Sequence, residues 1–229
     1  METGQAAEFP ASIAGRVIQP HHRCAALKSP TPSTSRWLGK NDPPRSVLML
    51  GLAGGTAFRV LRHLLPDCKL TAVDIDQEIV GLAREHMDLD ALGIEVVIGD
   101  AYAWLEKNKR AFDVVIDDIY LAGKTDVFRP REWDDGLMAH LKRAMAPGGV
   151  LAVNLVTGAG HRAMQSLTRR VLRENFPVVR TITSAEAMNE VLVAGDFVAT
   201  ERRLAVRNEA FPEWRDKMFW DRLKVRRIS

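Results

Sequence analysis

Four short apolar segments of the sequence each end in a glycine or an aspartate. These end residues, in chain order, are Gly51, Asp74, Asp100 and Asp118. A glycine after a buried strand lets the backbone approach a ligand, and a carboxylate at the end of the next strand can accept hydrogen bonds from both hydroxyls of a ribose. Asp100, followed by Ala101, suits the amino group and ring face of an adenine. Any single aspartate could instead cap a helix, but four such ends in succession predict a ligand that contains adenosine.

The loop after the first segment, GLAGGT (residues 51–56), excludes two common kinds of nucleotide site. The dinucleotide motif G-x-G-x-x-G would need glycine at Ala53 and Thr56, and the phosphate-binding motif G-x-x-x-x-G-K-S/T is absent from the sequence. A cofactor with a pyrophosphate group is therefore not expected.

Strands and helices alternate along the part of the chain that carries these residues. Apolar runs bounded by turn residues predict strands, and apolar residues at helical spacing predict helices. The expected strands are residues 47–50, 70–73, 95–98, 112–116, 150–156, 178–183 and 191–194, and the expected helices are residues 57–65, 77–87, 101–108, 131–145 and 161–175. This order predicts a Rossmann-like, doubly wound α/β sheet, mostly parallel with an antiparallel C-terminal strand. Such sheets bind ligands at the carboxyl ends of their strands.

Four segments resemble, in the same order, the motifs of class I S-adenosylmethionine-dependent transferases, and more narrowly those of the spermidine-synthase branch. The segments are VLMLGLAGGT (residues 47–56), TAVDID (71–76), VVIGDAYAWL (96–105) and FDVVIDD (112–118). The resemblance implies a cofactor site at the strand ends, with Gly51, Ala53 and Gly54 beside the methionine part, Asp74 and Ile75 at the ribose and adenine, Asp100 and Ala101 at the adenine edge, and Asp118 at the reacting centre.

The sequence departs from the spermidine-synthase motifs at two acidic positions. The aspartate of G-G-G-D-G-G-T, which holds the amine of decarboxylated S-adenosylmethionine in that branch, falls on Ala53. The second aspartate of D-S-S-D, the base that deprotonates the attacking amine, falls on Leu121. A site without these acids no longer excludes a carboxylate. We therefore expect S-adenosylmethionine as the cofactor and methyl transfer to a small-molecule acceptor, an aromatic or amine-containing secondary metabolite.

Two other functions stay open on the sequence. A polyamine aminopropyltransferase would share the strand-end motifs and would bind decarboxylated S-adenosylmethionine more tightly. A nucleic-acid-directed or non-catalytic module would use the basic segment at residues 201–229. Apolar residues at helical spacing in that segment favour an ordinary amphipathic helix, so a nucleic-acid partner is not expected.

Three residues beyond the strand ends are candidates for the acceptor side. Tyr120, which follows Asp118 by two positions, is a candidate for catalysis and for substrate contact, with a packing tyrosine as the alternative. His161 could act as a catalytic base near neutral pH, or it could lie exposed at the start of a helix. Trp133 could wall an aromatic acceptor or belong to the core.

No metal site is expected. In the segment HHRC (residues 21–24), neighbouring side chains cannot easily converge on one ion, and no fourth ligand has a suitable spacing. The adjacent carboxylates of Asp117 and Asp118 lack a nearby partner of the kind that Mg²⁺ needs.

The composition suits one globular domain, since 46% of the 229 residues are apolar and 27% are charged. No apolar run is long enough to span a membrane, and the use of two cysteines, Cys24 and Cys68, fits a reducing cytoplasm. We expect an N-terminal arm or lid at residues 1–44, the ligand-binding catalytic domain at 45–195 and an amphipathic tail at 196–229. The arm and the tail both need a surface to cover, which makes a homodimer plausible.

Overall fold

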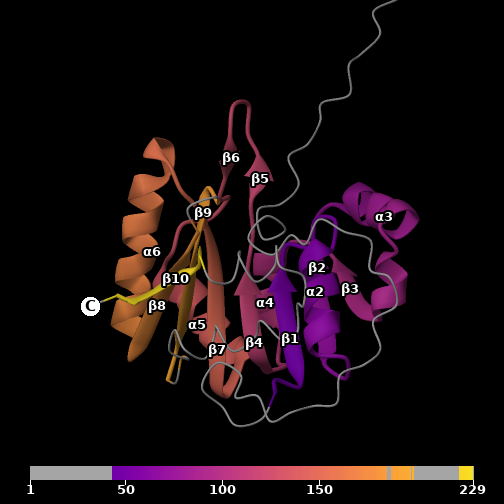
Figure 1. Ribbon diagram of the computed structural model, residues 1–229, viewed down its shortest axis with the longest axis horizontal. Coiled ribbons are helices and arrows are strands. Elements are labelled where there is room, and N and C mark those ends of the chain that lie inside the picture. Colours follow the sequence, from indigo (N-terminus) through magenta and orange to yellow (C-terminus); the bar gives the residue numbers. More distant parts are fainter. Residues whose placement is uncertain (1–42, 185–186, 197, 199–221, 229) are drawn as a thin grey trace, which may run out of the picture.

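One mixed β-sheet forms the centre of the fold (Figure 1). The structure is a computed structural model that describes residues 43–184, 187–196, 198 and 222–228. The sheet has eight strands in the order β10-β8-β9-β7-β4-β1-β2-β3. Their bounds are β1 Ser46–Leu50, β2 Lys69–Asp74, β3 Ile94–Ile98, β4 Phe112–Asp117, β7 Met145–Val156, β8 Val178–Thr183, β9 Asn189–Gly195 and β10 Lys224–Arg227.

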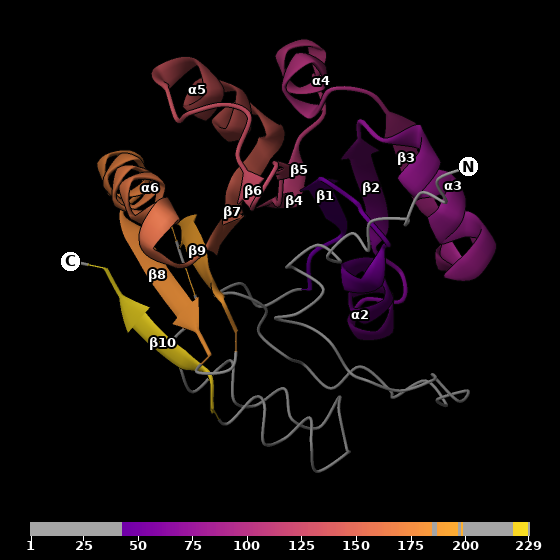
Figure 2. The ribbon, with the colours of Figure 1, turned by 90° about the horizontal axis from the view of Figure 1, so that it is seen from above.

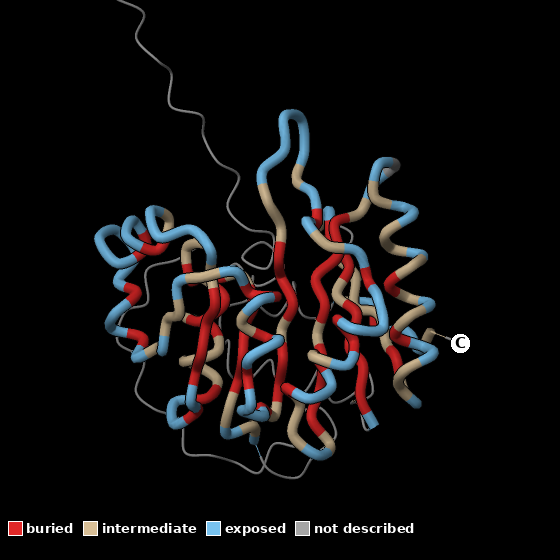
Figure 3. Tube along the Cα trace, turned by 180° about the vertical axis from the view of Figure 1, so that it is seen from behind, coloured by how far each residue is buried: buried red, intermediate tan, exposed pale blue. Residues whose placement is uncertain are grey.

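Helices cover both faces of the sheet (Figure 2). They are α2 Thr56–Leu64, α3 Gln77–His86, α4 Ala101–Lys107, α5 Asp135–Ala144 and α6 Arg162–Asn175, with short 3₁₀ helices η1 Leu89–Leu92 and η2 Ala159–His161. Leu105, Leu141 and Leu172 bring α4, α5 and α6 into one buried cluster. Phe58 and Val80 bring α2 and α3 into a second cluster on the opposite face. The central strands are therefore buried on both sides, as Figure 3 shows, which explains their continuous apolar runs.

The strands that carry the predicted site are parallel and end together. β4, β1, β2 and β3 are neighbours, and β7 lies parallel beside β4. Leu50 is aligned with Val73 on one side and with Asp117 on the other. β9 is antiparallel between β7 and β8, and β10 is antiparallel to β8. This arrangement confirms the predicted Rossmann-like sheet with an antiparallel C-terminal strand.

Several local features differ from the sequence-based expectation. A two-stranded hairpin, β5 Leu121–Ala122 with β6 Val127–Phe128, projects beyond the sheet after β4 (Figure 1). α5 begins later than residue 131, because the Asp134 side chain caps it at the Leu137 N–H. β7 begins at Met145, earlier than the expected residue 150, so the strand includes the Pro-Gly-Gly segment. Its pairing with β4 shifts register at this segment, as in a β-bulge.

The two chain ends lie mostly beyond the described residues. All but the last two residues of the predicted 1–44 arm fall there, and so does most of the amphipathic segment predicted at residues 201–229. The end of the predicted tail contributes β10 to the sheet edge. Among the described helices, none has the length and apolar character to cross a membrane.

Candidate functional site

The glycine loop after β1 needs glycine at its first position. Gly51 has a φ of +88°, and a Cβ atom on it would lie 2.5 Å from the backbone oxygen of Asp118. Its N–H donates to the carbonyl of Val73. Ala53 also has a positive φ, 46°, in the left-handed region that costs an alanine about 1 kcal/mol. The loop is therefore held in a tight conformation against the ends of β2 and β4.

Asp74, at the end of β2, binds the backbone of this loop. Its Oδ2 accepts hydrogen bonds from the N–H groups of Leu52, at 2.6 Å, and Ala53, at 3.0 Å. Its Oδ1 accepts one from the Asp76 N–H at 2.9 Å. Since a carboxylate has about four acceptor positions, Asp74 can still accept a hydrogen bond from a ligand. Ile75 beside it is 56% exposed, which is unusual for an isoleucine next to a buried strand.

Asp100 caps the helix that follows β3. Its Oδ1 accepts from the Ala103 N–H at 2.8 Å, and the carboxylate is exposed. Ala101 is buried in the first turn of α4. The capping role weighed from the sequence therefore applies to Asp100, and its predicted contact with an adenine stays a prediction.

The two adjacent aspartates at the end of β4 form hydrogen bonds with different side chains. Asp117 accepts two hydrogen bonds from Arg129, at 2.9 and 2.5 Å, in a pair whose side chains are 0% and 1% exposed. The Arg129 guanidinium stacks 4.7 Å from the ring centre of Trp133. Burial lowers the pKa of Arg129, but the charge and hydrogen bonds of Asp117 outweigh it and the pKa ends above its usual value. The pair connects β4 to the segment after the hairpin.

Asp118 belongs to a second buried group of polar side chains. Its Oδ1 accepts from Nδ2 of Asn154 at 2.6 Å, and Oδ1 of Asn154 accepts from Nδ2 of Asn189 at 2.7 Å. The Tyr120 hydroxyl donates to the Asn154 carbonyl at 3.1 Å and accepts from the Val156 N–H at 3.2 Å. Burial raises the pKa of Tyr120, so this residue remains a neutral hydroxyl at neutral pH.

The sequence analysis missed Asn154 and Asn189, although a signal was present. Asn154 is a polar residue inside the apolar run at 150–156, and Asn189 begins the run of β9. A polar side chain in a strand buried on both faces must find a hydrogen-bond partner. The interruption of the apolar run therefore marks a position where a polar contact is required.

His161 contacts the hairpin. Its Nε2 lies 3.0 Å from Oδ2 of Asp126, in the turn between β5 and β6, and the His161 side chain is 17% exposed. Trp133 is 5% exposed and packs in the core shared by α4 and α5. The catalytic role predicted for His161 and the substrate contact predicted for Trp133 stay predictions.

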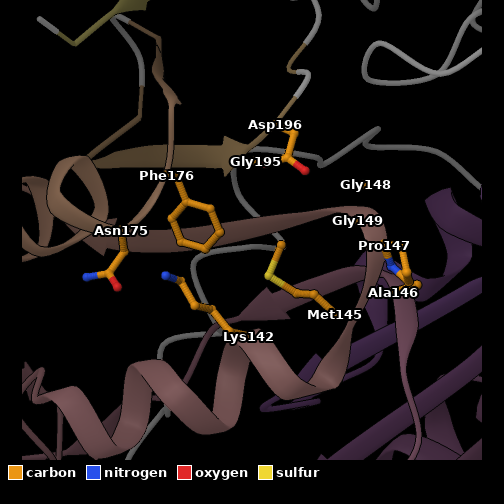
Figure 4. A pocket seen from close by; sticks show the side chains of 10 residues that line it. All are labelled: Lys142, Met145, Ala146, Pro147, Gly148, Gly149, Asn175, Phe176, Gly195 and Asp196. Atoms are coloured by element: carbon orange, nitrogen blue, oxygen red, sulfur yellow. The ribbon is translucent and has the colours of Figure 1, made fainter.

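A hollow of about 360 Å³ lies where β7 begins and β9 ends. Figure 4 shows its lining, which includes Lys142, Met145, Phe176 and Gly195, at the start of β7 and the end of β9. The predicted site residues instead follow the carboxyl ends of β1, β2, β3 and β4, away from this hollow. The described part of the chain also holds no group of three or more His, Cys, Asp or Glu side chains that could bind a metal ion.

Comparison with known proteins identifies the family. Residues 37–185 match the model of the spermine/spermidine synthase domain. Polyamine aminopropyltransferase 2 of Pseudomonas aeruginosa is 27% identical over 81% of this chain and 58% of its own length. A relative from Bifidobacterium longum, a probable polyamine aminopropyl transferase, is 34% identical over 50% of this chain and 25% of its own. The chain thus spans only part of these relatives.

A solved structure supports the same fold. Human methyltransferase-like protein 13, in complex with SAH, superposes with a TM-score of 0.62 at 20% identity, covering 74% of this chain and 81% of that one. At this level of identity the likeness shows the fold and carries no further conclusion about activity.

The comparisons overturn the expected methyl transfer. The family match and several polyamine aminopropyltransferases among the relatives favour the second function weighed from the sequence. The expected use of S-adenosylmethionine as a methyl donor is wrong with it, and the comparisons give no support to the link to secondary metabolism. The error came from weighting the absent acids at Ala53 and Leu121 above the shared motifs, although single substitutions change how a site works more readily than they change its family. With a match that includes the strand ends at Gly51, Asp74, Asp100 and Asp118, the chain belongs to the spermine/spermidine synthase domain family.

Proposed function

We propose that the protein is a polyamine aminopropyltransferase, which transfers the aminopropyl group of decarboxylated S-adenosylmethionine to an amine of a polyamine. The observation that carries this proposal is the match of residues 37–185 to the spermine/spermidine synthase domain. The chemistry of the strand ends supports it independently, because the glycine loop and the carboxylates after β2 and β3 suit an adenosine-containing donor.

The donor's nucleoside would lie across the ends of β1, β2 and β3. The backbone of the loop at Gly51, Ala53 and Gly54 would line the sulfonium side. Asp74 would accept a hydrogen bond from a ribose hydroxyl through its remaining acceptor positions, while it keeps the glycine loop in place. The exposed side chain of Ile75 would cover one face of the adenine.

The donor's ammonium group would be held by Asp118. Decarboxylated S-adenosylmethionine has lost its carboxylate, so its side arm ends in a single primary ammonium. Ala53 offers no charge to this group, whereas Asp118 is a carboxylate that is only 6% exposed at the end of β4. A buried carboxylate gains most from a charged hydrogen-bond donor, because the interior screens the pair poorly.

The transfer itself is an in-line displacement at carbon. The nitrogen lone pair of the acceptor amine forms a bond to the methylene carbon next to sulfur, and the carbon–sulfur electron pair returns to sulfur as methylthioadenosine leaves. The positive sulfonium already activates this carbon, so the protein contributes chiefly by aligning the two reactants and excluding water.

The proton of the acceptor amine has no carboxylate to receive it at Leu121. Tyr120 cannot take it near neutral pH as a phenolate, because burial raises the pKa of its hydroxyl. We therefore infer that the neutral fraction of the polyamine is the reactive form and that the proton leaves to solvent after the carbon–nitrogen bond has formed. On this mechanism the rate rises with pH until the acceptor amine is fully deprotonated.

The test is a transfer assay with the full chain. Decarboxylated S-adenosylmethionine labelled in its aminopropyl group is supplied with putrescine, and labelled spermidine and methylthioadenosine are measured by mass spectrometry. We expect both products in equal amounts, and a large loss of both in the Asp118→Asn variant. A parallel reaction receives S-adenosylmethionine. Transfer of its methyl group, with no aminopropyl product in the first reaction, would contradict the proposal.

A further inference from the structure

Three polar side chains lie in a row where β4 and β7 end and β9 begins. Asp118, Asn154 and Asn189 are 6%, 3% and 3% exposed. The register explains their proximity, because Val156 is aligned with Asn189 and Asn154 with Val191, so the two asparagines are diagonal neighbours on β7 and β9. The hydrogen bonds run from Asn189 to Asn154, at 2.7 Å, and from Asn154 to Asp118, at 2.6 Å.

The direction of these hydrogen bonds follows from the charge of Asp118. An ionised carboxylate can only accept, so Asn154 must turn its NH₂ group toward Asp118. The carbonyl oxygen of Asn154 then faces Asn189, which must turn its own NH₂ group toward it. One charge thereby sets the orientation of two amide groups, the second of which does not contact the carboxylate.

The backbone around Asn154 leaves its side chain little freedom. The Tyr120 hydroxyl bridges the Asn154 carbonyl and the Val156 N–H, and β9 pairs with β7 along this stretch. A buried amide that is held on both sides cannot exchange its two ends without breaking the hydrogen bonds that it makes to its neighbours. The orientation of Asn154 is therefore a fixed property of the folded chain.

We propose that the amide pair, Asn154 and Asn189, keeps Asp118 ionised and turned toward the donor, so that both asparagines are positioning residues for the recognition of the donor's ammonium group. The assignment of the ammonium to Asp118 rests on the proposed function. The direction of the hydrogen bonds, in contrast, follows from side chains of the protein itself and does not depend on the proposed function. The two parts can therefore be tested separately.

The first test reverses the direction of the hydrogen bonds by a substitution at Asn189, the residue of the three that does not contact Asp118. In Asn189→Asp, a side chain of nearly the same shape can only accept when it is ionised. Asn154 must then donate to residue 189 and turn its carbonyl oxygen toward Asp118, which places two acceptors against each other. We expect a clear fall in melting temperature at pH 8 for the full chain. The deficit should shrink in acid, because the protonated carboxyl at residue 189 can donate as Asn189 does.

A second substitution should repair the first. In the double variant Asp118→Asn with Asn189→Asp, the new asparagine can donate to Asn154, and Asn154 can donate to residue 189, so that every hydrogen bond is made in the opposite direction. We expect the double variant to regain most of the melting temperature lost in Asn189→Asp. In the matched control, Asn189→Ala, the same second substitution should restore nothing. If the effects of the two substitutions on the melting temperature at pH 8 were additive, the proposed direction of the hydrogen bonds would be wrong.

Binding and kinetics test the role in donor recognition. In Asn189→Asp we expect the KM for decarboxylated S-adenosylmethionine to rise about tenfold, with kcat less affected, since Asp118 would lose the hydrogen-bond donor that orients it for binding. Affinity for methylthioadenosine, which lacks the ammonium, should change less. Equal losses for both ligands would contradict the positioning role. If no aminopropyl transfer occurs in the wild type, the proposed function fails, whereas the melting experiment still decides the polarity.

Discussion

The proposed site has a nucleoside side (the loops after β1, β2 and β3) and an amine side (the ends of β4 and β7, the start of β9 and the β5–β6 hairpin), and the two sides are built in different ways. On the nucleoside side, carboxylates bind backbone N–H groups and remain partly exposed, as Asp74 does at Leu52. On the amine side, the two carboxylates at the end of β4 are buried and bind side chains from other parts of the chain, as Asp118 does at Asn154, 36 positions away.

The difference shows where specificity can change within a shared fold. A site made from backbone and helix caps depends on the conformation of short segments, so few specific side chains are needed to hold a nucleoside there. A site made from buried side-chain pairs depends on several strands at once, and one substitution there changes charge and orientation together. Of the two absent acids, the one at Ala53 falls in the loop after β1 and the one at Leu121 falls in the hairpin of the amine side.

Removing Arg129 should give the largest effect, because it leaves a buried charge on the amine side without its partner. We expect Arg129→Met to lower the free energy of unfolding by about 3–5 kcal/mol, since both side chains of the pair are almost fully buried. Urea unfolding followed by circular dichroism measures this loss. A double variant with Asp117→Val should recover much of it, because apolar side chains of similar size carry no charge into the core.

An exposed ion pair on the nucleoside side provides the matched control. Arg84 and Asp90 lie 3.2 Å apart with side chains 49% and 78% exposed. Because water screens such pairs, Arg84→Met should cost at most about 1 kcal/mol. Similar losses in Arg84→Met and Arg129→Met would remove the distinction between the two sides.

Gly51 joins the two sides, and its replacement should have the next largest effect. An alanine there would need a φ of +88° and would place Cβ 2.5 Å from the Asp118 backbone oxygen. We expect Gly51→Ala to destabilise the fold by about 2 kcal/mol or more and to displace the backbone that carries Asp118. Thermal unfolding measures the first effect, and the KM for the donor measures the second.

Gly81 is the control for this substitution. It lies inside α3, and nothing approaches the position of a Cβ atom within 4 Å. Gly81→Ala should therefore stabilise the protein by about 0.5–1 kcal/mol, because alanine favours the helix. A destabilised Gly81→Ala together with an unaffected Gly51→Ala would contradict the assigned role of the loop.

The two sides also differ in how far the sequence predicts them. The strand order and the residues of the nucleoside side follow from local patterns, since Asp74 and Asp100 directly follow apolar runs and Gly51 begins a turn. The amine side depends on which strands are neighbours. Asn189 reaches Asn154 because β9 inserts antiparallel beside β7, and no spacing in the sequence indicates this insertion.

The hairpin and the function illustrate the same limit. β5 and β6 are two residues each, too short for a period to be recognised, and their pairing depends on the turn that ends at Asp126. The function was misjudged because absent acids at two positions were visible in the sequence, whereas the buried polar group around Asp118 was not. The order of the motifs in the sequence predicted the fold. The contacts of the amine side became visible only in the structure, which shows which strands are neighbours.

A smaller effect should separate the two roles of Asp100 on the nucleoside side. Asp100→Ala removes the cap of α4 and should cost about 1 kcal/mol, while Asp100→Ser retains a capping oxygen and should restore most of this stability. If the carboxylate also contacts the adenine, Asp100→Ser should still bind methylthioadenosine several-fold more weakly, as measured by calorimetry. Full affinity in the serine variant would limit Asp100 to the helix cap.

The contact between His161 and Asp126 should have the smallest effect, because it joins an exposed turn to the start of α6. The hydrogen bond from His161 holds the pKa of Asp126 below its usual value of 3.8. A carboxyl whose pKa is lowered on folding stabilises the protein above its unfolded pKa, and this contribution is lost as the pH falls through the folded value. The melting temperature of His161→Leu should therefore lie slightly below that of the wild type at neutral pH, and the difference should narrow in strong acid. A difference that is unchanged by acid would show that His161 acts through packing and not through its contact with the Asp126 carboxylate.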